Sequence, residues 1–268
     1  MTFTIKALIL GIIQGITEFV PVSSSGHLVL ANHFIGLELQ DITFEIALHI
    51  GTLLSVLIFF RKEILILLSS LYNIRDRSKE RVRDRRIILY LLTGTVVTGF
   101  LGIMMKASVE KVFYNPLFSA FMLLVTGTII FISDYIRPGE ILMAKTGIGK
   151  SVIIGISQAF AILPGISRSG STIATGIFLG LKRAEAARFS FLLSIPAILG
   201  ATLFDFRKFT VIRTEYLPGY ALGTIAAFIS GYLVISLLLT LIKKRQLKFF
   251  SFYCWTVAIL VILILLLP

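Results

Sequence analysis

Long apolar segments separated by short polar stretches occupy most of the 268-residue chain. A helix needs about 20 predominantly apolar residues to cross a bilayer. The pattern predicts full transmembrane helices at 43–60, 87–106, 116–136, 188–206, 217–242 and 249–267. We therefore expect an all-α integral membrane protein with six full spans, folded as a single membrane domain over 1–268.

Two further apolar segments, 5–36 and 148–181, are interrupted near their centres by Pro, Gly and Ser. We interpret each as a re-entrant hairpin, in which two short helices joined by an unwound stretch enter the membrane and turn back. Irregular backbone at membrane depth is tolerated only where protein buries it or water reaches it. Both breaks are therefore expected to face a cavity inside the protein.

The two interrupted segments carry copies of one polar motif, 144 residues apart. The first reads GIIQGITEFVPVSSSGH from Gly11 to His27, and the second reads GISQAFAILPGISRSGS from Gly155 to Ser171. An alignment without gaps pairs Gly11 with Gly155, Gln14 with Gln158, Ser23 with Ser167, Ser25 with Ser169 and Gly26 with Gly170. This predicts two repeat units, about 5–62 and about 148–208, each a broken hairpin followed by a full span.

The distribution of positive charge predicts the orientation of the chain. Residues 61–86 hold nine Lys/Arg and are expected to form a cytoplasmic loop, whose alternating charges at 75–86 indicate a solvated helix extension or contact with lipid headgroups. Counting spans from this loop places 137–147, 182–187 and 243–248 inside, and 107–115 and 207–216 outside. The two units then cross the membrane with opposite topology, as an inverted repeat whose hairpin tips can meet near the midplane.

The composition supports the membrane interpretation and narrows the possible partners. Hydrophobic residues make up 56% of the chain, charged residues 15%, and the mean hydropathy is +0.94. The net charge of +12 lies mostly in loops between apolar segments, so we expect a membrane and no nucleic acid as partner. The single cysteine, Cys254, lies in an apolar run and is expected to be a small buried hydrophobe.

Polar side chains at apolar depth predict a functional site in the two motifs. Gln14 and Glu18 are four residues apart, so they share one helical face. The hydroxyl-rich turns at Ser23–Gly26 and Ser167–Thr172 each lead into a helix, where amide N–H groups and the helix dipole favour an anion. Arg168 within the second turn favours phosphate or carboxylate.

This inventory of side chains is typical of phosphoryl-group chemistry. Arg168 would hold the phosphate, Glu18 and Gln14 would hold water or a divalent cation, Mg²⁺ or Ca²⁺, and a serine or His27 would attack phosphorus or shuttle the proton. Each residue also has a structural interpretation: Glu18 and Arg168 as a buried ion pair, His27 as a cap, single serines as packing residues. We expect Glu45 to line or support the site, and His49 and Asp205 to be structural.

Over essentially its full length the chain resembles the undecaprenyl-pyrophosphate phosphatase family of bacteria, also called the bacitracin-resistance family. The resemblance rests on Gln14-Gly-Ile-Thr-Glu18, Pro21-Val-Ser-Ser-Ser-Gly-His27 and Pro164-Gly-Ile-Ser-Arg-Ser-Gly-Ser-Thr172. It implies a metal-dependent enzyme of the plasma membrane, open to the extracytoplasmic side. Such an enzyme removes the terminal phosphate of undecaprenyl pyrophosphate and recycles the lipid carrier for cell-wall synthesis. A homodimer is also expected.

The resemblance also implies roles for individual residues. Glu18 would be the essential acidic residue, Ser24 the nucleophile, His27 its base or acid, and Arg168 the phosphate clamp. The pyrophosphate pocket would be lined by Gln14, Ser23, Ser25, Gly26, Ser167, Ser169, Gly170 and Thr172. Many members have Glu where this chain has Gln14, which removes a metal-binding charge and weakens the case for Gln14 as a direct ligand.

Two questions stay open at the level of the sequence. Attack by Ser24, by His27 or by a water activated by Glu18 is compatible with the same residues. The alternative function is a transporter or flippase of a polyprenyl phosphate or another anionic lipid, because inverted repeats with broken helices are typical of secondary transporters. The Ser/His pair favours the hydrolase, since binding alone would not require a nucleophile beside a base.

Overall fold

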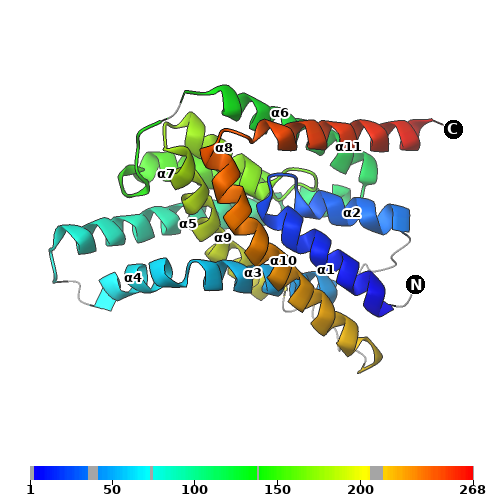
Figure 1. Ribbon diagram of the computed structural model, residues 1–268, viewed down its shortest axis with the longest axis horizontal. Coiled ribbons are helices and arrows are strands. Elements are labelled where there is room, and N and C mark those ends of the chain that lie inside the picture. The colour runs from blue at the N-terminus through cyan, green and yellow to red at the C-terminus, as the bar shows by residue number, and fades with distance from the viewer. Residues whose placement is uncertain (1–2, 36–41, 73–74, 138, 206–213, 268) are drawn as a thin grey trace.

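The computed structural model describes residues 3–35, 42–72, 75–137, 139–205 and 214–267, which are helical apart from short connections and one β-bridge between Ile141 and Leu181. Figure 1 shows the arrangement. The helices are α1 (Phe3–Phe19), α2 (Ser24–Ile35), α3 (Ile42–Phe59), α4 (Arg61–Tyr72), α5 (Lys79–Val112), α6 (Pro116–Tyr135), α7 (Ile148–Phe160), α8 (Arg168–Phe178), α9 (Arg183–Asp205), α10 (Leu217–Lys243) and α11 (Lys248–Leu266). The all-α prediction is confirmed.

The predicted transmembrane spans appear as long apolar helices. Within the described residues, α5, α6, α9, α10 and α11 are long and apolar enough to cross a bilayer, and the bent pair α3–α4 makes a sixth candidate. The protein is therefore a multi-pass membrane protein. The largest difference in length is at α5, which runs from Lys79 to Val112 and includes the basic residues predicted to extend this helix beyond 87–106.

The prediction of a loop directly after residue 60 is wrong. Residues Arg61–Tyr72 form α4, which meets α3 at a bend of 76°. Its apolar run is too short to cross a bilayer, and the Lys and Arg residues on either side of it led to the prediction of a loop. Leu67 and Ser70 of α4 are buried, whereas Leu65 is 63% exposed and Leu68 is 56% exposed. The apolar surface left outside the protein indicates that α4 contacts lipid.

Both interrupted segments fold as two short helices joined by a turn, as predicted. Helix α1 ends at Phe19 and α2 begins at Ser24, while α7 ends at Phe160 and α8 begins at Arg168. Helices α2, α7 and α8 have 12, 13 and 11 residues, too few to cross about 30 Å of hydrocarbon. The end of the predicted second unit, 206–208, and most of the predicted loop 207–216 lie outside the described residues.

The two halves of the chain interlock around the hairpins. Helix α10, which follows the second unit, packs on α1 and α3, while α5, which follows the first, packs on α7. Helix α11 lies along α6, and α6 also contacts α2 and α8 (Figure 1). Each hairpin is therefore held by a helix from the other half. The opposite orientation of the two units across the membrane stays a prediction.

Small residues allow the closest of these contacts, between α1 and α10. A Cβ atom built on Gly11 would lie 2.2 Å from the carbonyl oxygen of Gly223, so the two backbones touch. We expect Gly11→Ala to force α1 from α10 and to destabilise the protein by about 1–3 kcal/mol, measured as a lower midpoint of thermal unfolding in detergent. Gly99→Ala is the matched control, because a Cβ there meets nothing within 4 Å. Equal midpoints for the two variants would contradict this packing.

Candidate functional site

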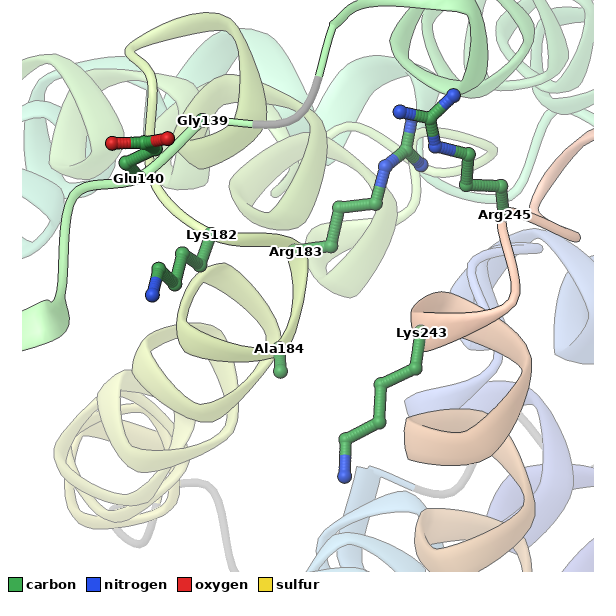
Figure 2. A pocket seen from close by; sticks show the side chains of 7 residues that line it. All are labelled: Gly139, Glu140, Lys182, Arg183, Ala184, Lys243 and Arg245. Carbon is green, nitrogen blue, oxygen red and sulfur yellow. The ribbon is translucent and has the colours of Figure 1, made fainter.

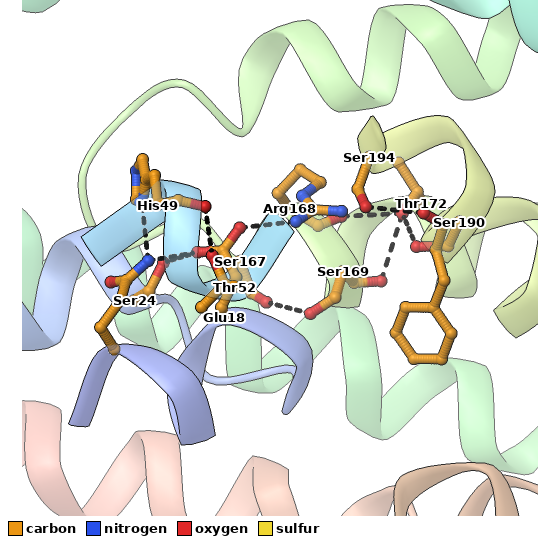
Figure 3. A network of polar contacts seen from close by, with 12 residues as sticks. Glu18, Ser24, His49, Thr52, Ser167, Arg168, Ser169, Thr172, Ser190 and Ser194 are labelled. Carbon is orange, nitrogen blue, oxygen red and sulfur yellow. Dashed lines mark hydrogen bonds and ion pairs between the residues drawn. The ribbon is translucent and has the colours of Figure 1, made fainter. Parts of the chain in front are cut away.

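The carboxylate of Glu18, in the last turn of α1, joins the two hairpins (Figure 3). Its Oε2 accepts hydrogen bonds from Gln14 Nε2 at 3.0 Å and from Ser24 Oγ at 2.6 Å. Its Oε1 accepts one from Arg168 Nη2 at 2.6 Å. The side chains of Glu18 and Arg168 are only 7% and 15% exposed, so the ion pair is largely shielded from solvent. Three of the four residues predicted to carry the chemistry therefore meet at one carboxylate.

Ser24 is placed by the turn that separates α1 from α2. The residue before it, Ser23, has φ of 69°, a left-handed conformation that non-glycine residues rarely adopt. Ser24 then opens α2, and its hydroxyl donates to Glu18. Backbone strain of this kind collects at functional sites. A serine O–H held by a buried carboxylate is an oriented hydroxyl with a proton acceptor beside it.

The two turns have the same internal hydrogen bonds, as the alignment of the motifs predicts. In the first, Ser23 Oγ accepts from Gly26 N at 3.3 Å and lies 3.3 Å from Ser25 Oγ. In the second, the equivalent distances, from Ser167 Oγ to Gly170 N and to Ser169 Oγ, are 3.1 and 3.2 Å. Ser23 and Ser167 thus bind the first free N–H groups of the following helices.

The tips of the two hairpins touch each other. A Cβ on Gly26 would lie 2.9 Å from the Cα of Gly165, so only glycine fits there. Gly165 itself has φ of 95°, in the left-handed region that favours glycine. Ser169 Oγ donates across the contact to the carbonyl oxygen of Val20 at 3.3 Å. The expected meeting of the two hairpins is therefore present.

Arg168 keeps one side of its guanidinium free for a ligand. Nη2 is taken by Glu18, but Nη1 is buried and has no hydrogen-bond partner among the described residues. The backbone behind it is fixed by Thr172, whose Oγ1 donates to Arg168 O at 2.8 Å and lies 2.6 Å from Ser190 Oγ. Thr172 thus supports the arginine instead of facing it. A buried donor without a partner is costly, and a phosphate oxygen would satisfy it.

His49 of α3 belongs to the same network, although the sequence interpretation made it structural. Its Nδ1 lies 2.6 Å from Gln14 Nε2, which also donates to Glu18. The amide nitrogen of Gln14 can donate one proton to each of these two partners. The second repeat unit, about 148–208, contains no histidine, so the repeat gave no signal for this residue. Glu45 lies one turn before His49 on α3, and the side chain of Asp205 lies outside the described part.

His27 points away from Ser24, contrary to the expected pairing. Its Nδ1 donates to Ser23 O at 2.7 Å, and its Nε2 accepts from Tyr253 Oη of α11 at 2.8 Å. The rings of His27 and Tyr253 stack at 5.6 Å between centroids. Glu18, not His27, therefore lies next to the Ser24 hydroxyl. Tyr253 was missed by the sequence analysis, whereas its neighbour Cys254 is fully buried as predicted.

The oxygen atoms around Glu18 fit a cation that is coordinated partly by the protein and partly by a bound phosphate. Within the described residues there is no group of three or more His, Cys, Asp or Glu placed to hold a metal ion. The available oxygens are the Glu18 carboxylate and Gln14 Oε1, which is buried and has no described partner. Mg²⁺ is usually held by one or two carboxylates together with substrate phosphates and water. The donor set fits that mode and not an all-protein cage.

Comparisons with known proteins match nearly the whole chain. The sequence model of the family described as bacitracin resistance protein BacA matches residues 7–260. A protein of Methanobrevibacter smithii named undecaprenyl-diphosphatase is 42% identical over 266 residues, covering 96% of both chains. Relatives with the same name from Methanosphaera stadtmanae and Desulforapulum autotrophicum are 40% and 38% identical, covering 97% and 96% of this chain and 97% of each relative. Both motifs lie inside the matched region.

Proposed function

Because this chain belongs to the bacitracin resistance protein BacA family, we propose that it hydrolyses undecaprenyl pyrophosphate to undecaprenyl phosphate and inorganic phosphate. The observation that carries the proposal is the contact between Ser24 Oγ and Glu18 Oε2 at 2.6 Å, with Arg168 on the other oxygen of the same carboxylate. The nucleophile Ser24, its base Glu18 and the phosphate-binding Arg168 therefore lie side by side. Release of the lipid carrier in this way would serve cell-wall synthesis and resistance to bacitracin.

The reaction proceeds through a phosphoserine in this proposal. Ser24 Oγ attacks the terminal phosphorus while Glu18 takes the serine proton, and the bond from phosphorus to the bridging oxygen breaks. Undecaprenyl phosphate leaves with the proton that Glu18 returns to it. Water then attacks the phosphoserine and gives a proton to Glu18, Ser24 Oγ leaves and regains that proton, and inorganic phosphate is released. Arg168 stabilises the equatorial oxygens in both steps.

The two turns bind the pyrophosphate in this mechanism. The first turns of α2 and α8 carry N–H groups that no carbonyl of their own helix accepts, and the positive ends of both helix dipoles lie there. Arg168 Nη1 adds a charged donor. A bound divalent cation would neutralise phosphate charge, with Glu18 and Gln14 Oε1 as the protein groups that hold it.

The two histidines position other groups. His49 holds Gln14 against Glu18, because Gln14 Nε2 bonds to both. His27 ties the Ser23 carbonyl to Tyr253 of α11 and so fixes the strained turn that presents Ser24. His27 therefore acts through the backbone in this proposal, and the general base is Glu18.

The plasma membrane is the proposed location, with the site open to the extracytoplasmic side. The support is that three connections predicted to be cytoplasmic meet at one end of the protein, where Glu140, Lys182 and Lys243 line one pocket. The positive-inside count requires all three connections to lie on the same side of the membrane.

The transporter alternative is not favoured. Transport of an anionic lipid needs Arg168 and the helix N-termini, but it gives no reason for a serine hydroxyl bonded to a buried carboxylate. The curated relatives at 38–42% identity are also named as a phosphatase.

Phosphate release from undecaprenyl pyrophosphate by the purified protein in detergent tests the proposal. We expect release with Mg²⁺ or Ca²⁺, and at least about a tenfold slower rate in EDTA, because the site supplies one carboxylate against several phosphate charges. Re-addition of the cation to the same sample is the control for loss of folding. Folded protein that binds the lipid but releases no phosphate under any of these conditions would contradict the phosphatase and support transport.

A further inference from the structure

A second polar site lies where three connections of the chain meet. The segments between α6 and α7, between α8 and α9, and between α10 and α11 surround a pocket of about 400 Å³. Figure 2 shows the residues that line it, which are Gly139, Glu140, Lys182, Arg183, Ala184, Lys243 and Arg245. None of them contacts the Glu18 network described above.

The pocket carries excess positive charge. Lys182, Lys243 and Arg245 form no ion pair within the described part of the chain, and Glu140 is the one carboxylate among the lining residues. Positive side chains that line one hollow give it a positive electrostatic potential, which attracts anions. The rule that places Lys and Arg on the cytoplasmic side requires charge in these connections, but it does not require that the charged residues line one pocket.

Arg183 gives an independent sign of a ligand. Its side chain is 6% exposed and is held by Asp134 Oδ1 at 2.8 Å and by main-chain oxygens of the α6 end. Its Nε is nevertheless buried without a partner. Arg183 and Ala184 also form the first turn of the 23-residue helix α9, where N–H groups lack helical acceptors. A buried donor and a helix N-terminus thus border the same pocket, which suits an anion.

Arg245 occupies a backbone position that favours glycine. It follows the C-terminus of α10 with φ of 55°, in the left-handed region. Figure 2 shows its side chain and that of Arg183 extending toward each other. A long cationic side chain kept at a strained position points to a role for its charge.

We propose that this pocket binds a phosphate dianion, either the monoester headgroup of an anionic lipid or free inorganic phosphate. Two negative charges on a tetrahedral group match several unpaired cations, the Arg183 Nε donor and the α9 N-terminus. The predicted topology places the pocket on the cytoplasmic side. This inference does not depend on the reaction at Glu18.

Isothermal titration of the full-length protein in detergent tests the proposal, with dioctanoyl phosphatidic acid and inorganic phosphate as separate probes. An Arg168→Ala background removes the phosphate ligand of the other site. We expect Arg245→Gly, which the left-handed backbone accommodates, to raise the dissociation constant about fivefold. Lys182→Gln, Lys243→Gln and Arg245→Gly together should raise it about a hundredfold. The matched control replaces three exposed cations elsewhere, Arg77, Lys79 and Arg86, by Gln.

Each outcome decides one point. Pocket-dependent binding of phosphatidic acid but not of inorganic phosphate identifies a lipid headgroup, and the reverse result identifies free phosphate. Thermal unfolding of each variant shows that it is folded, and Arg245→Gly alone should unfold no earlier than the parent. Equal losses in the pocket variant and the control variant, or binding of neither probe, would overturn the proposal and leave the charges with a role in orientation only.

Discussion

Replacing Ser24 by alanine is expected to lower kcat for phosphate release by at least about 10⁴-fold. In the proposed mechanism Ser24 Oγ forms the bond to phosphorus, and loss of an attacking oxygen removes the covalent route while Arg168 and both helix N-termini still bind the substrate. KM should therefore change little. The measurement is phosphate release at saturating lipid, combined with mass spectrometry of acid-quenched wild-type protein for phosphate on the peptide that contains Ser24.

Ser25→Ala is the control for this experiment. The same atom is removed one residue away, but the Ser25 hydroxyl contacts Ser23 Oγ within the turn and not Glu18. We expect a loss of about tenfold or less from weaker binding of phosphate. An active Ser24→Ala variant would eliminate the serine route, and attack by a water activated by Glu18 would then be the mechanism.

Local patterns in the sequence predicted the framework of the site. The two hairpins, their breaks and the pairing of Ser23 with Ser167 follow from the spacing of the motifs. Their role as caps came from the structure, where each hydroxyl accepts from the N–H group three residues on. The contact between Glu18 and Arg168, 150 residues apart, was predicted only as one interpretation of paired motifs. The repeat made it plausible because equivalent turns of two interlocked units can meet.

The sequence did not predict the directions of side chains or the contacts between residues far apart in the chain. His27 follows Ser24 by three residues, so a pair was expected, but its two ring nitrogens contact the Ser23 carbonyl and Tyr253, the latter 226 residues away. His49 was missed for a related reason: its partner Gln14 lies 35 residues away and the second unit has no equivalent. Helix α4 was missed because its apolar run is shorter than a span and is flanked by charge.

Glu18→Gln and Arg168→Gln should each lower kcat/KM by about 10²–10⁴-fold, the first by removing the base and the second by removing the phosphate ligand. Each single variant also leaves an unpaired charge at a site where the partners are 7% and 15% exposed. Removing one partner of a buried pair destabilises a protein by about 3–5 kcal/mol, and partial exposure of Arg168 places the expected loss at or below the lower end.

The double variant separates catalysis from stability. Glu18→Gln with Arg168→Gln leaves two neutral amides that are able to hydrogen-bond to each other, so the midpoint of thermal unfolding should return toward that of the wild type. Activity should not return, because neither a base for Ser24 nor a charge for the phosphate is present. Phosphate release and unfolding midpoints for all four proteins complete the double-mutant cycle. A double variant that regained both stability and activity would mean that Glu18 and Arg168 only hold the two hairpins together, and the chemistry would have to be assigned to other groups.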